Sequence, residues 1–283
     1  IAAIPGWHPR PATPMTAHLV NAVDVVKTFK AKSGEVKALD HVSLAAKAGE
    51  TIGIVGESGS GKSTIAKCLV GLEEADAGQI EISGTDILAL PLGKRKPHRK
   101  LMQIVFQDPN AALNPRHTIG RTIIDVLRVN GVTKPKLREA AMELLDDVKL
   151  DRLFFARFPH ALSGGQRHRV CIARALAAEP KILIADEALS ALDVSVQRQM
   201  LALFADLREK HHLTILFITH DLRVAAEICD DLLVMQSGKV VASGAPADIL
   251  EGHLHPYVSE LMNAIPGQDW FPVGSQSLAQ VEG

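Results

Sequence analysis

The stretch GESGSGKST, residues 56–64, decides the fold, because it fits the spacing G-x-x-x-x-G-K-[ST] at every constrained position. Before it stands TIGIV, residues 51–55, a short β-branched apolar run typical of a buried strand. After it stands IAKCLVGL, residues 65–72, which has the spacing of a buried helix. The sequence therefore predicts a strand, a tight loop and a helix N-terminus in direct succession.

This loop has the composition of a site for a nucleoside triphosphate. Its glycines let the backbone turn tightly and aim amide groups inward, where the helix dipole also favours a polyanion. Lys62 supplies a positive charge to the β- and γ-phosphates, and the Ser63 hydroxyl is a ligand for Mg²⁺. A chance glycine-rich turn is the alternative, which the flanking strand and helix disfavour. The candidate binding residues are Gly56, Glu57, Ser58, Gly59, Ser60, Gly61, Lys62, Ser63 and Thr64.

The composition fits a soluble enzyme. With 283 residues, 47% of them hydrophobic, the chain can bury a large core as one α/β unit with an inserted subdomain. The net charge of −1 gives no electrostatic reason to expect nucleic acid as a partner. The longest apolar runs have strand length, so no membrane span and no secretory signal is predicted. The three scattered cysteines are expected to be reduced core residues of a cytosolic protein.

Apolar patterns in the rest of the chain indicate strands first and then an alternation of strands and helices. Between residues 108 and 160 the pattern becomes helical, and KLREAAMELLDDV (residues 136–148) has a 3.6-residue period. We therefore expect a helical insertion in an α/β sheet. The basic cluster at residues 93–100 is expected to be a solvated face, with phosphate or acidic lipid contact as the alternative. Short strands around turns are predicted at 17–28, 36–46 and 81–87, and further core strands at 101–106, 181–185, 214–219 and 231–235.

Two further motifs carry chemistry. In KILIADE an apolar strand ends in Asp186 and Glu187, which places both carboxylates beside the phosphate loop. Asp186 suits the Mg²⁺ shell, and Glu187 suits orientation of the attacking water. The alternative is a pair of acids that cap a strand at the surface.

The second motif is LSGGQ, residues 162–166, which precedes the apolar helix RVCIARAL. Ser163 is a candidate N-cap, and Gly164 and Gly165 leave backbone amides open for an anion. Alone, this pentapeptide is a helix cap more often than a ligand site.

Six motifs, namely GESGSGKST, FQDP, LSGGQ, ILIADE, SALD and FITHD, occur in the order found in ATP-binding cassette ATPases. The resemblance spans roughly residues 17–252. It implies a phosphate-loop NTPase fold, with a RecA-like α/β core, an N-terminal antiparallel β subdomain and an inserted α-helical subdomain at about 108–165. It also implies that two cassettes meet head to tail, with ATP and Mg²⁺ held between one loop and the other chain's LSGGQ, including Gln166.

Residue roles follow from the same resemblance. Gln107 resembles the glutamine that contacts Mg²⁺ and water, and His220 resembles the histidine that contacts the γ-phosphate. Asp193 resembles the aspartate that acts across the dimer, and Phe29 stands where an aromatic ring faces adenine, although a core role is the alternative. Proline often follows the catalytic glutamate, and here Ala188 and Leu189 follow it; His168 stands where glutamine is frequent. None of these departures removes a residue needed for hydrolysis.

Less universal segments resemble the peptide-importer subfamily, which handles dipeptides, oligopeptides, nickel and related solutes; the most selective is HPYVSELMNAIP, residues 255–266. This implies an ATP hydrolase at the cytoplasmic face of the inner membrane. Its partners would be a second cassette, two transmembrane permease subunits and, indirectly, an extracytoplasmic solute-binding protein, without nucleic acid. No cysteine follows Cys229, so no iron–sulfur segment is predicted. The alternatives are an importer of nickel or another small solute, a soluble cassette protein acting on ribosomes or DNA, and a switch module without turnover.

The two ends of the chain resemble each other. IAAIPG at residues 1–6 echoes NAIPG at residues 263–267, and proline- and glycine-rich sequence follows each copy. Our hypothesis is that residues 1–16 are a linker or tail remnant of a preceding cassette in a tandem protein, and that residues 253–283 form the importer-type tail. Coincidence is the alternative.

Overall fold

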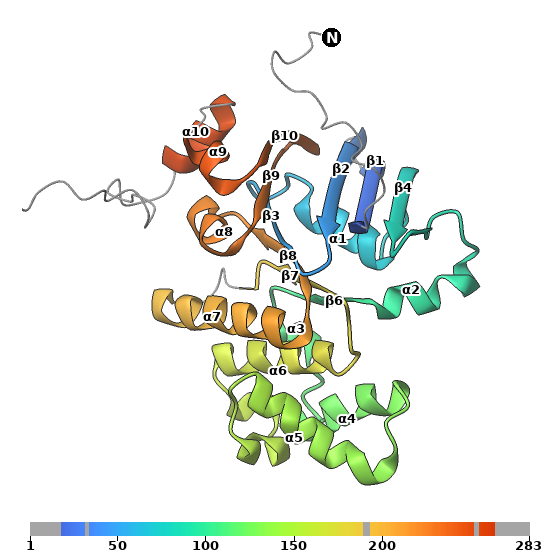
Figure 1. Cartoon of the computed structure of the whole chain (residues 1–283), viewed down its shortest axis with the longest axis vertical. Coiled ribbons are helices and arrows are strands. Elements are labelled where there is room, and N and C mark those ends of the chain that lie inside the picture. Colours follow the sequence, from blue (N-terminus) through green and yellow to red (C-terminus); the bar gives the residue numbers. More distant parts are fainter. Residues whose placement is uncertain (1–17, 32–33, 189–192, 252–254, 264–283) are drawn as a thin grey trace, which may run out of the picture.

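Two β-sheets and two groups of helices form the described part of the chain (Figure 1). The computed structural model describes residues 18–31, 34–188, 193–251 and 255–263. The first sheet has the strand order β2-β1-β4-β5, and its pairs are antiparallel. It consists of β1 (His18–Ala31), β2 (Gly34–Lys47), β4 (Ala77–Ile82) and β5 (Thr85–Asp86).

The second sheet is the core of the molecule and has the order β10-β9-β3-β8-β7-β6. All of its pairs are parallel except β9 with β10. The continuous apolar runs in the sequence are explained by burial on both faces, since every residue of β3, β7 and β8 is buried. Its strands are β3 (Thr51–Val55), β6 (Met102–Val105), β7 (Ile182–Asp186), β8 (Thr214–Thr219), β9 (Asp231–Gln236) and β10 (Lys239–Gly244).

Parallel pairing brings the predicted motifs to one edge of this sheet. Val55 is opposite Thr219, and Asp186 is opposite Ile218. The segments that follow β3, β7 and β8 therefore begin side by side at the carboxyl ends of the strands, which is where α/β sheets bind ligands.

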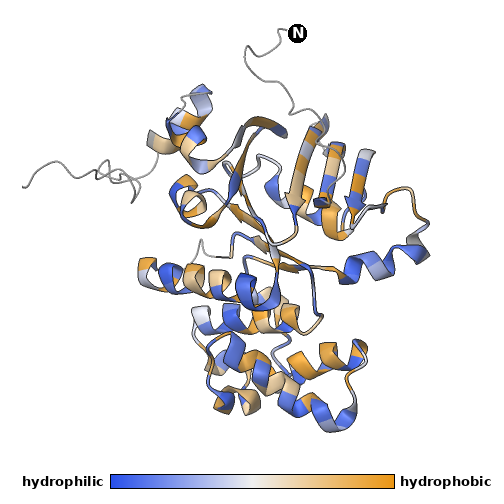
Figure 2. Cartoon of the chain, in the orientation of Figure 1, coloured by the Kyte–Doolittle hydropathy of each residue, from blue (hydrophilic) through white to orange (hydrophobic). Residues whose placement is uncertain are grey.

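Helices between β6 and β7 form the lower lobe in Figure 1. Hydrophobic residues run through the central strands, whereas these helices alternate polar and apolar residues, as amphipathic helices do (Figure 2). Their buried faces join the larger hydrophobic core, which includes Ile123, Leu145 and Ile172. The lobe comprises α3 (Pro109–Ala112), α4 (Ile119–Val129), α5 (Leu137–Asp147) and α6 (Gly164–Leu176), with 3-10 turns at Lys134–Lys136, Arg152–Ala156 and Pro159–Ala161.

The other helices flank the two sheets. A 3-10 turn at Leu92–Lys94 leads into α2, which carries the basic cluster. The helices are α1 (Lys62–Val70), α2 (Lys96–Lys100), α7 (Val194–His211), α8 (Leu222–Ile228), α9 (Pro246–Glu251) and α10 (Pro256–Asn263). The α/β architecture with an antiparallel sheet and a helical insertion is thus confirmed. The proposed terminal remnant at residues 1–16 lies outside the described residues.

Residues 81–87 belong to short strands around a turn, as predicted, although the first strand, β4, begins earlier, at Ala77. After β4 the chain turns back and pairs with itself as β5. Ser83 and Gly84 adopt φ angles of 51° and 77°, which are those of a tight hairpin turn. A serine–glycine pair is a common turn signal, so the local sequence agrees with this hairpin.

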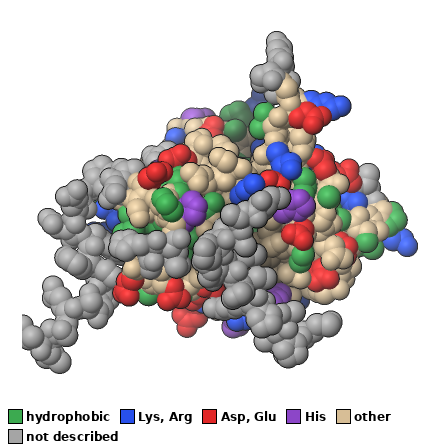
Figure 3. All heavy atoms as spheres, turned by 90° about the horizontal axis from the view of Figure 1, so that it is seen from above, with side chains coloured by type: hydrophobic (Ala, Val, Ile, Leu, Met, Phe, Trp, Pro, Cys, Tyr) green, Lys and Arg blue, Asp and Glu red, His purple; other side chains and the backbone are tan. Residues whose placement is uncertain are grey.

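The buried cysteines and the mixed surface charges agree with what the composition predicts. Cys68, Cys171 and Cys229 are buried and free, and burial raises the pKa of the first two thiols to about 11. Figure 3 shows acidic, basic and hydrophobic side chains interspersed over the described part of one face. Within the described ranges, no helix is both long enough and apolar enough to cross a bilayer.

Candidate nucleotide site

The loop at residues 56–64 leaves β3 and enters α1 as the sequence predicts. Lys62 is 3% exposed, and its Nζ donates hydrogen bonds of 2.8 Å to the carbonyl oxygens of Gly56 and Glu57. The Ser60 amide donates to Glu57 O over 3.2 Å, and Gly238 N donates to Ser60 O over 2.9 Å. The loop is therefore folded around the lysine ammonium group.

Two glycines are required by close packing of this loop. A Cβ on Gly56 would lie 2.2 Å from the carbonyl oxygen of Met235. Gly61 has a φ of 108°, and a Cβ there would lie 2.5 Å from the carbonyl oxygen of Ala38. Because backbone atoms cannot yield as flexible side chains do, any larger residue would displace the loop from β9 or β2.

Ser63 and Asp186 meet although they are far apart in the sequence. The Ser63 hydroxyl donates a 2.9 Å hydrogen bond to Asp186 Oδ1. Asp186 is only 6% exposed, and burial raises the pKa of its carboxyl, opposed by the Ser63 hydrogen bond. A buried carboxylate next to a hydroxyl fits a hard divalent cation, which favours oxygen ligands and would compensate the desolvated charge.

Glu187 completes a cluster of three charges. Its Oε1 lies 3.7 Å from Lys62 Nζ, and its backbone adopts a φ of 48° while its amide donates to Ile218 O. Left-handed backbone at a non-glycine residue is unfavourable and persists where the surroundings impose it, often in active sites. Burial lowers the pKa of Lys62, and the neighbouring Glu187 carboxylate opposes this shift.

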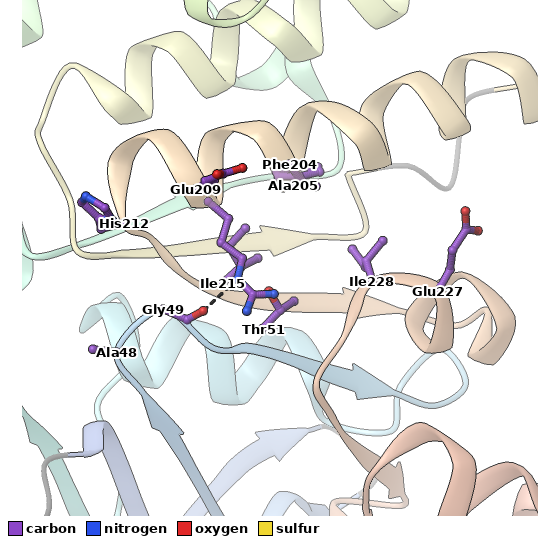
Figure 4. A pocket seen from close by; sticks show the side chains of 11 residues that line it. Ala48, Gly49, Thr51, Phe204, Ala205, Glu209, His212, Ile215, Glu227 and Ile228 are labelled. Carbon is purple, nitrogen blue, oxygen red and sulfur yellow. Dashed lines mark hydrogen bonds between the residues drawn. The ribbon is translucent and has the colours of Figure 1, made fainter. Parts of the chain in front are cut away.

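Lys62, Ser63 and Glu187 line a cavity of about 210 Å³. Gln107, which follows β6, lines it together with loop residues, Glu187 and Ala38 from β2. A larger cavity of about 730 Å³ lies at the amino ends of β3 and β8, against α7 (Figure 4). Its lining includes Thr51 and Ile215, which begin or nearly begin their strands, so it is at the opposite edge of the sheet. Of these two cavities, the smaller is the candidate phosphate site, because it gathers the glycine loop, a buried lysine and an acid.

His220 and Phe29 do not line that cavity. His220 is exposed in the turn between β8 and α8, where Thr219 Oγ1 accepts a hydrogen bond from Asp221 N. Phe29 is 37% exposed in β1, with Lys27 Nζ at 5.3 Å from its ring centroid, and it is opposite Val36 of β2. Both residues are therefore available to a ligand that extends beyond the phosphate loop.

LSGGQ forms the start of α6 and also lies outside the cavity. The Ser163 side chain accepts a hydrogen bond from Gln166 N, and the Gln166 side chain accepts one from Ser163 N. This is a capping box, which leaves the amides of Gly164 and Gly165 at the positive end of the helix. Asp193 is the N-cap of α7, and its side chain accepts a hydrogen bond from Val196 N. Hydrogen bonds from Ser195 and Val196 hold the pKa of Asp193 below its usual range.

Two contacts could not have been found by motif reasoning. His168, on α6, is 2% exposed, and its Nε2 donates a 3.0 Å hydrogen bond to the carbonyl oxygen of Gln107. Tyr257, in the HPY segment (residues 255–257), accepts a 2.9 Å hydrogen bond from Glu57 N. Sequence marked His168 as a departure and Tyr257 as a subfamily feature, but neither residue type nor spacing reveals contacts across 61 and 200 residues.

Known proteins resemble this chain in sequence and in structure. A putative peptide import ATP-binding protein of Brucella ovis is 42% identical over 252 residues, covering 89% of this chain and 80% of the relative. An oligopeptide transport ATP-binding protein of Bacillus subtilis is 45% identical, covering 84% and 73%.

A solved ATP-binding cassette, described as a dimeric post-hydrolysis state bound to ADP and phosphate, superposes with a TM-score of 0.73. It is 31% identical, and the match covers 80% of this chain and 98% of that one. The family described as ABC transporter matches residues 39–190. This span includes the glycine loop, Gln107, LSGGQ, Asp186 and Glu187, so the chain belongs to the ABC transporter family.

Proposed function

We propose that this chain is the ATP-binding and ATP-hydrolysing subunit of an importer for peptides or related small solutes. One observation carries the proposal: buried Lys62, the Ser63–Asp186 hydrogen bond and Glu187 meet around one glycine loop. The relatives named for peptide import and oligopeptide transport support the solute class.

Different residues of the chain would perform different parts of ATP hydrolysis. Loop amides and Lys62 would bind the β- and γ-phosphates, and burial strengthens the attraction of Lys62 for them. Ser63, Gln107 and Asp186 would hold Mg²⁺, which when bound neutralises phosphate charge. Glu187 would orient the attacking water and accept its proton, while His220 would contact the γ-phosphate. Phosphoryl transfer needs mainly such positioning and charge stabilisation, which this rigid strand edge supplies.

A second cassette would complete the site. The helix N-terminus at Ser163–Gln166 is a second anion site away from the cavity of its own chain, and the dimeric cassette structure supports pairing of two such halves. Phe29 would face adenine, and Asp193 would act across the pair. The helical segment at about 108–157 would receive two membrane permease subunits, fed by a solute-binding protein, with the chain peripheral at the cytoplasmic face.

The variant Glu187→Gln tests the assignment of the catalytic acid. We expect ATP binding to persist and hydrolysis to fall by about 100-fold or more, because the amide keeps the shape but cannot accept the proton. Phosphate release and ATP affinity are measured on the same preparation. Glu209→Gln is the matched control, since it makes the same change beside the larger cavity. Turnover near the wild-type rate in Glu187→Gln would refute the role of Glu187.

A further inference from the structure

The HPY segment, residues 255–257, begins α10 and also contacts the phosphate loop. His255 Nδ1 accepts a 3.2 Å hydrogen bond from Tyr257 N. Pro256 occupies the first position of α10, where the missing amide hydrogen has no consequence. The Tyr257 hydroxyl accepts the 2.9 Å hydrogen bond from the amide of Glu57 in the phosphate loop. The His255–Tyr257 hydrogen bond lies at the start of α10, and the Tyr257–Glu57 hydrogen bond joins this helix to the nucleotide site.

We propose that Tyr257 is a positioning residue for the phosphate loop, through which the C-terminal helix α10 sets the affinity of the nucleotide site. This inference rests on the proposed binding of ATP at residues 56–64. Tyr257 lies outside the sequence motifs that are proposed to hold the nucleotide, and its hydrogen bond adds a contact to them.

The Tyr257–Glu57 hydrogen bond lies in a part of the loop that must keep its conformation when Lys62 exchanges carbonyl oxygens for phosphate oxygens. Glu57 is held on both sides: its amide donates to Tyr257, and its carbonyl oxygen accepts from Lys62 Nζ and from Ser60 N. Phosphate oxygens would compete with the carbonyl oxygens of Gly56 and Glu57 for Lys62. The Tyr257 hydroxyl then keeps the Glu57 amide in place, which preserves the shape of the loop as the ligand enters.

The helix that carries Tyr257 is itself anchored. Tyr257 is 2% exposed, and its neighbours Val258 and Leu261 belong to the larger hydrophobic core at 1% and 5% exposure. Burial also raises the pKa of the Tyr257 phenol, so the hydroxyl is retained across the neutral range. A fixed hydroxyl selects one loop conformation, whereas a mobile one would follow whatever conformation the loop adopts.

Tyr257→Phe removes the hydroxyl and keeps the ring. We expect the Kd for ATP, measured by calorimetry, to rise roughly 2- to 10-fold, which is the loss of one ordinary hydrogen bond. At saturating ATP we expect turnover close to the wild-type rate, because the catalytic groups are intact; a purely structural role would not separate KM from kcat in this way. Met262→Ala, at an exposed position of α10, is the control and should leave the Kd unchanged.

A second measurement uses the intact protein. Tyr257 is the single tyrosine of the chain, so 3-fluorotyrosine labels this position alone. We expect saturating ATP to shift its ¹⁹F resonance, because the hydroxyl contacts the loop that the phosphates occupy. If the wild-type chain binds ATP, an unchanged Kd in Tyr257→Phe, or a ¹⁹F resonance that ATP does not move, overturns the inference but leaves the proposed site intact. If the wild-type chain fails to bind ATP, the proposed function is wrong and the inference falls with it.

Discussion

Lys62 and Asp186 are charged groups placed where water cannot solvate them. Burial lowers the pKa of the lysine and raises the pKa of the aspartate, so in each case the charged form is disfavoured. In the proposed complex, phosphate would add negative charge beside Lys62, and a divalent cation would add positive charge beside Asp186. Perturbed ionisable groups of this kind cluster at functional sites, where stability is exchanged for binding.

Asp186→Asn should therefore stabilise the nucleotide-free chain. In the native state burial raises the pKa of Asp186 above its unfolded value, so the ionised carboxylate destabilises the fold at pH values above the raised pKa. The variant's melting temperature should exceed that of the wild type by a few degrees near pH 8. As the pH falls through the raised pKa toward the unfolded value, this advantage should shrink, because the wild-type carboxyl then becomes protonated.

The same variant should lose the response to ligand. Mg²⁺ and ATP raise the melting temperature of any chain that binds them only when folded. The wild type should gain stability from Mg²⁺ with ATP, and Asp186→Asn should gain much less. A variant that melts below the wild type without ligand, near pH 8, would contradict the burial argument.

The sequence predicted the members of this charge cluster but not all of its contacts. Lys62 and Ser63 follow from the local spacing of one loop, and Asp186 follows from its place after an apolar strand. The Ser63–Asp186 hydrogen bond, across 123 residues, agrees with these assignments because strand ends meet at one sheet edge. The support from His168 and Tyr257 depends on how helices pack on this edge, which no local pattern encodes.

Local sequence patterns predict many of the strands and helices, but they do not predict contacts between distant elements. Buried parallel strands such as β7 and β8 are continuous apolar runs, and α5 has a clear 3.6-residue period, so their existence was predictable. Short strands around a turn were predicted at residues 81–87, but the sequence did not reveal that β4 begins at Ala77. The contact of α10 with the loop was likewise invisible, although the HPY segment stood out.

Helix α6 combines a cap with a proposed anion site, and substitutions at Ser163 can separate the two roles. Asparagine and aspartate are both good N-caps, so Ser163→Asn and Ser163→Asp should melt close to the wild type. Ser163→Ala should lose about 1 kcal/mol of stability with the cap. Only Ser163→Asp puts a negative charge where phosphate is proposed to bind, so its ATPase rate should fall more than about tenfold below that of Ser163→Asn. Equal rates for these two variants would argue against the anion site.

At the scale of the whole molecule, the glycine loop and the start of α6 are two separate candidate anion sites. The glycine loop, Gln107 and Glu187 share the 210 Å³ cavity, whereas the start of α6 does not line it. If phosphate binds between the glycine loop of one chain and the start of α6 of another, two copies or two homologous cassettes must meet head to tail. Each would then supply the half that the other lacks.

Mixing two inactive variants tests this arrangement directly. In a head-to-tail pair, one site takes its loop and Glu187 from the first chain and Ser163 from the second. A mixed pair of Glu187→Gln and Ser163→Asp chains therefore contains one site with both substitutions and one site with neither. Random pairing makes about half of the dimers mixed, so the ATPase rate should recover to roughly a quarter of the wild-type rate if sites act independently.

The control for this recovery is a chain that carries both substitutions. Mixed with Glu187→Gln, it can form no site that has both an intact Glu187 and an intact Ser163, so the rate should stay at the level of the separate variants. A site built within one chain predicts the same flat result for every mixture, because neither variant then gains anything from its partner. Recovery only in the pairing of Glu187→Gln with Ser163→Asp would thus require that phosphate binds between two chains.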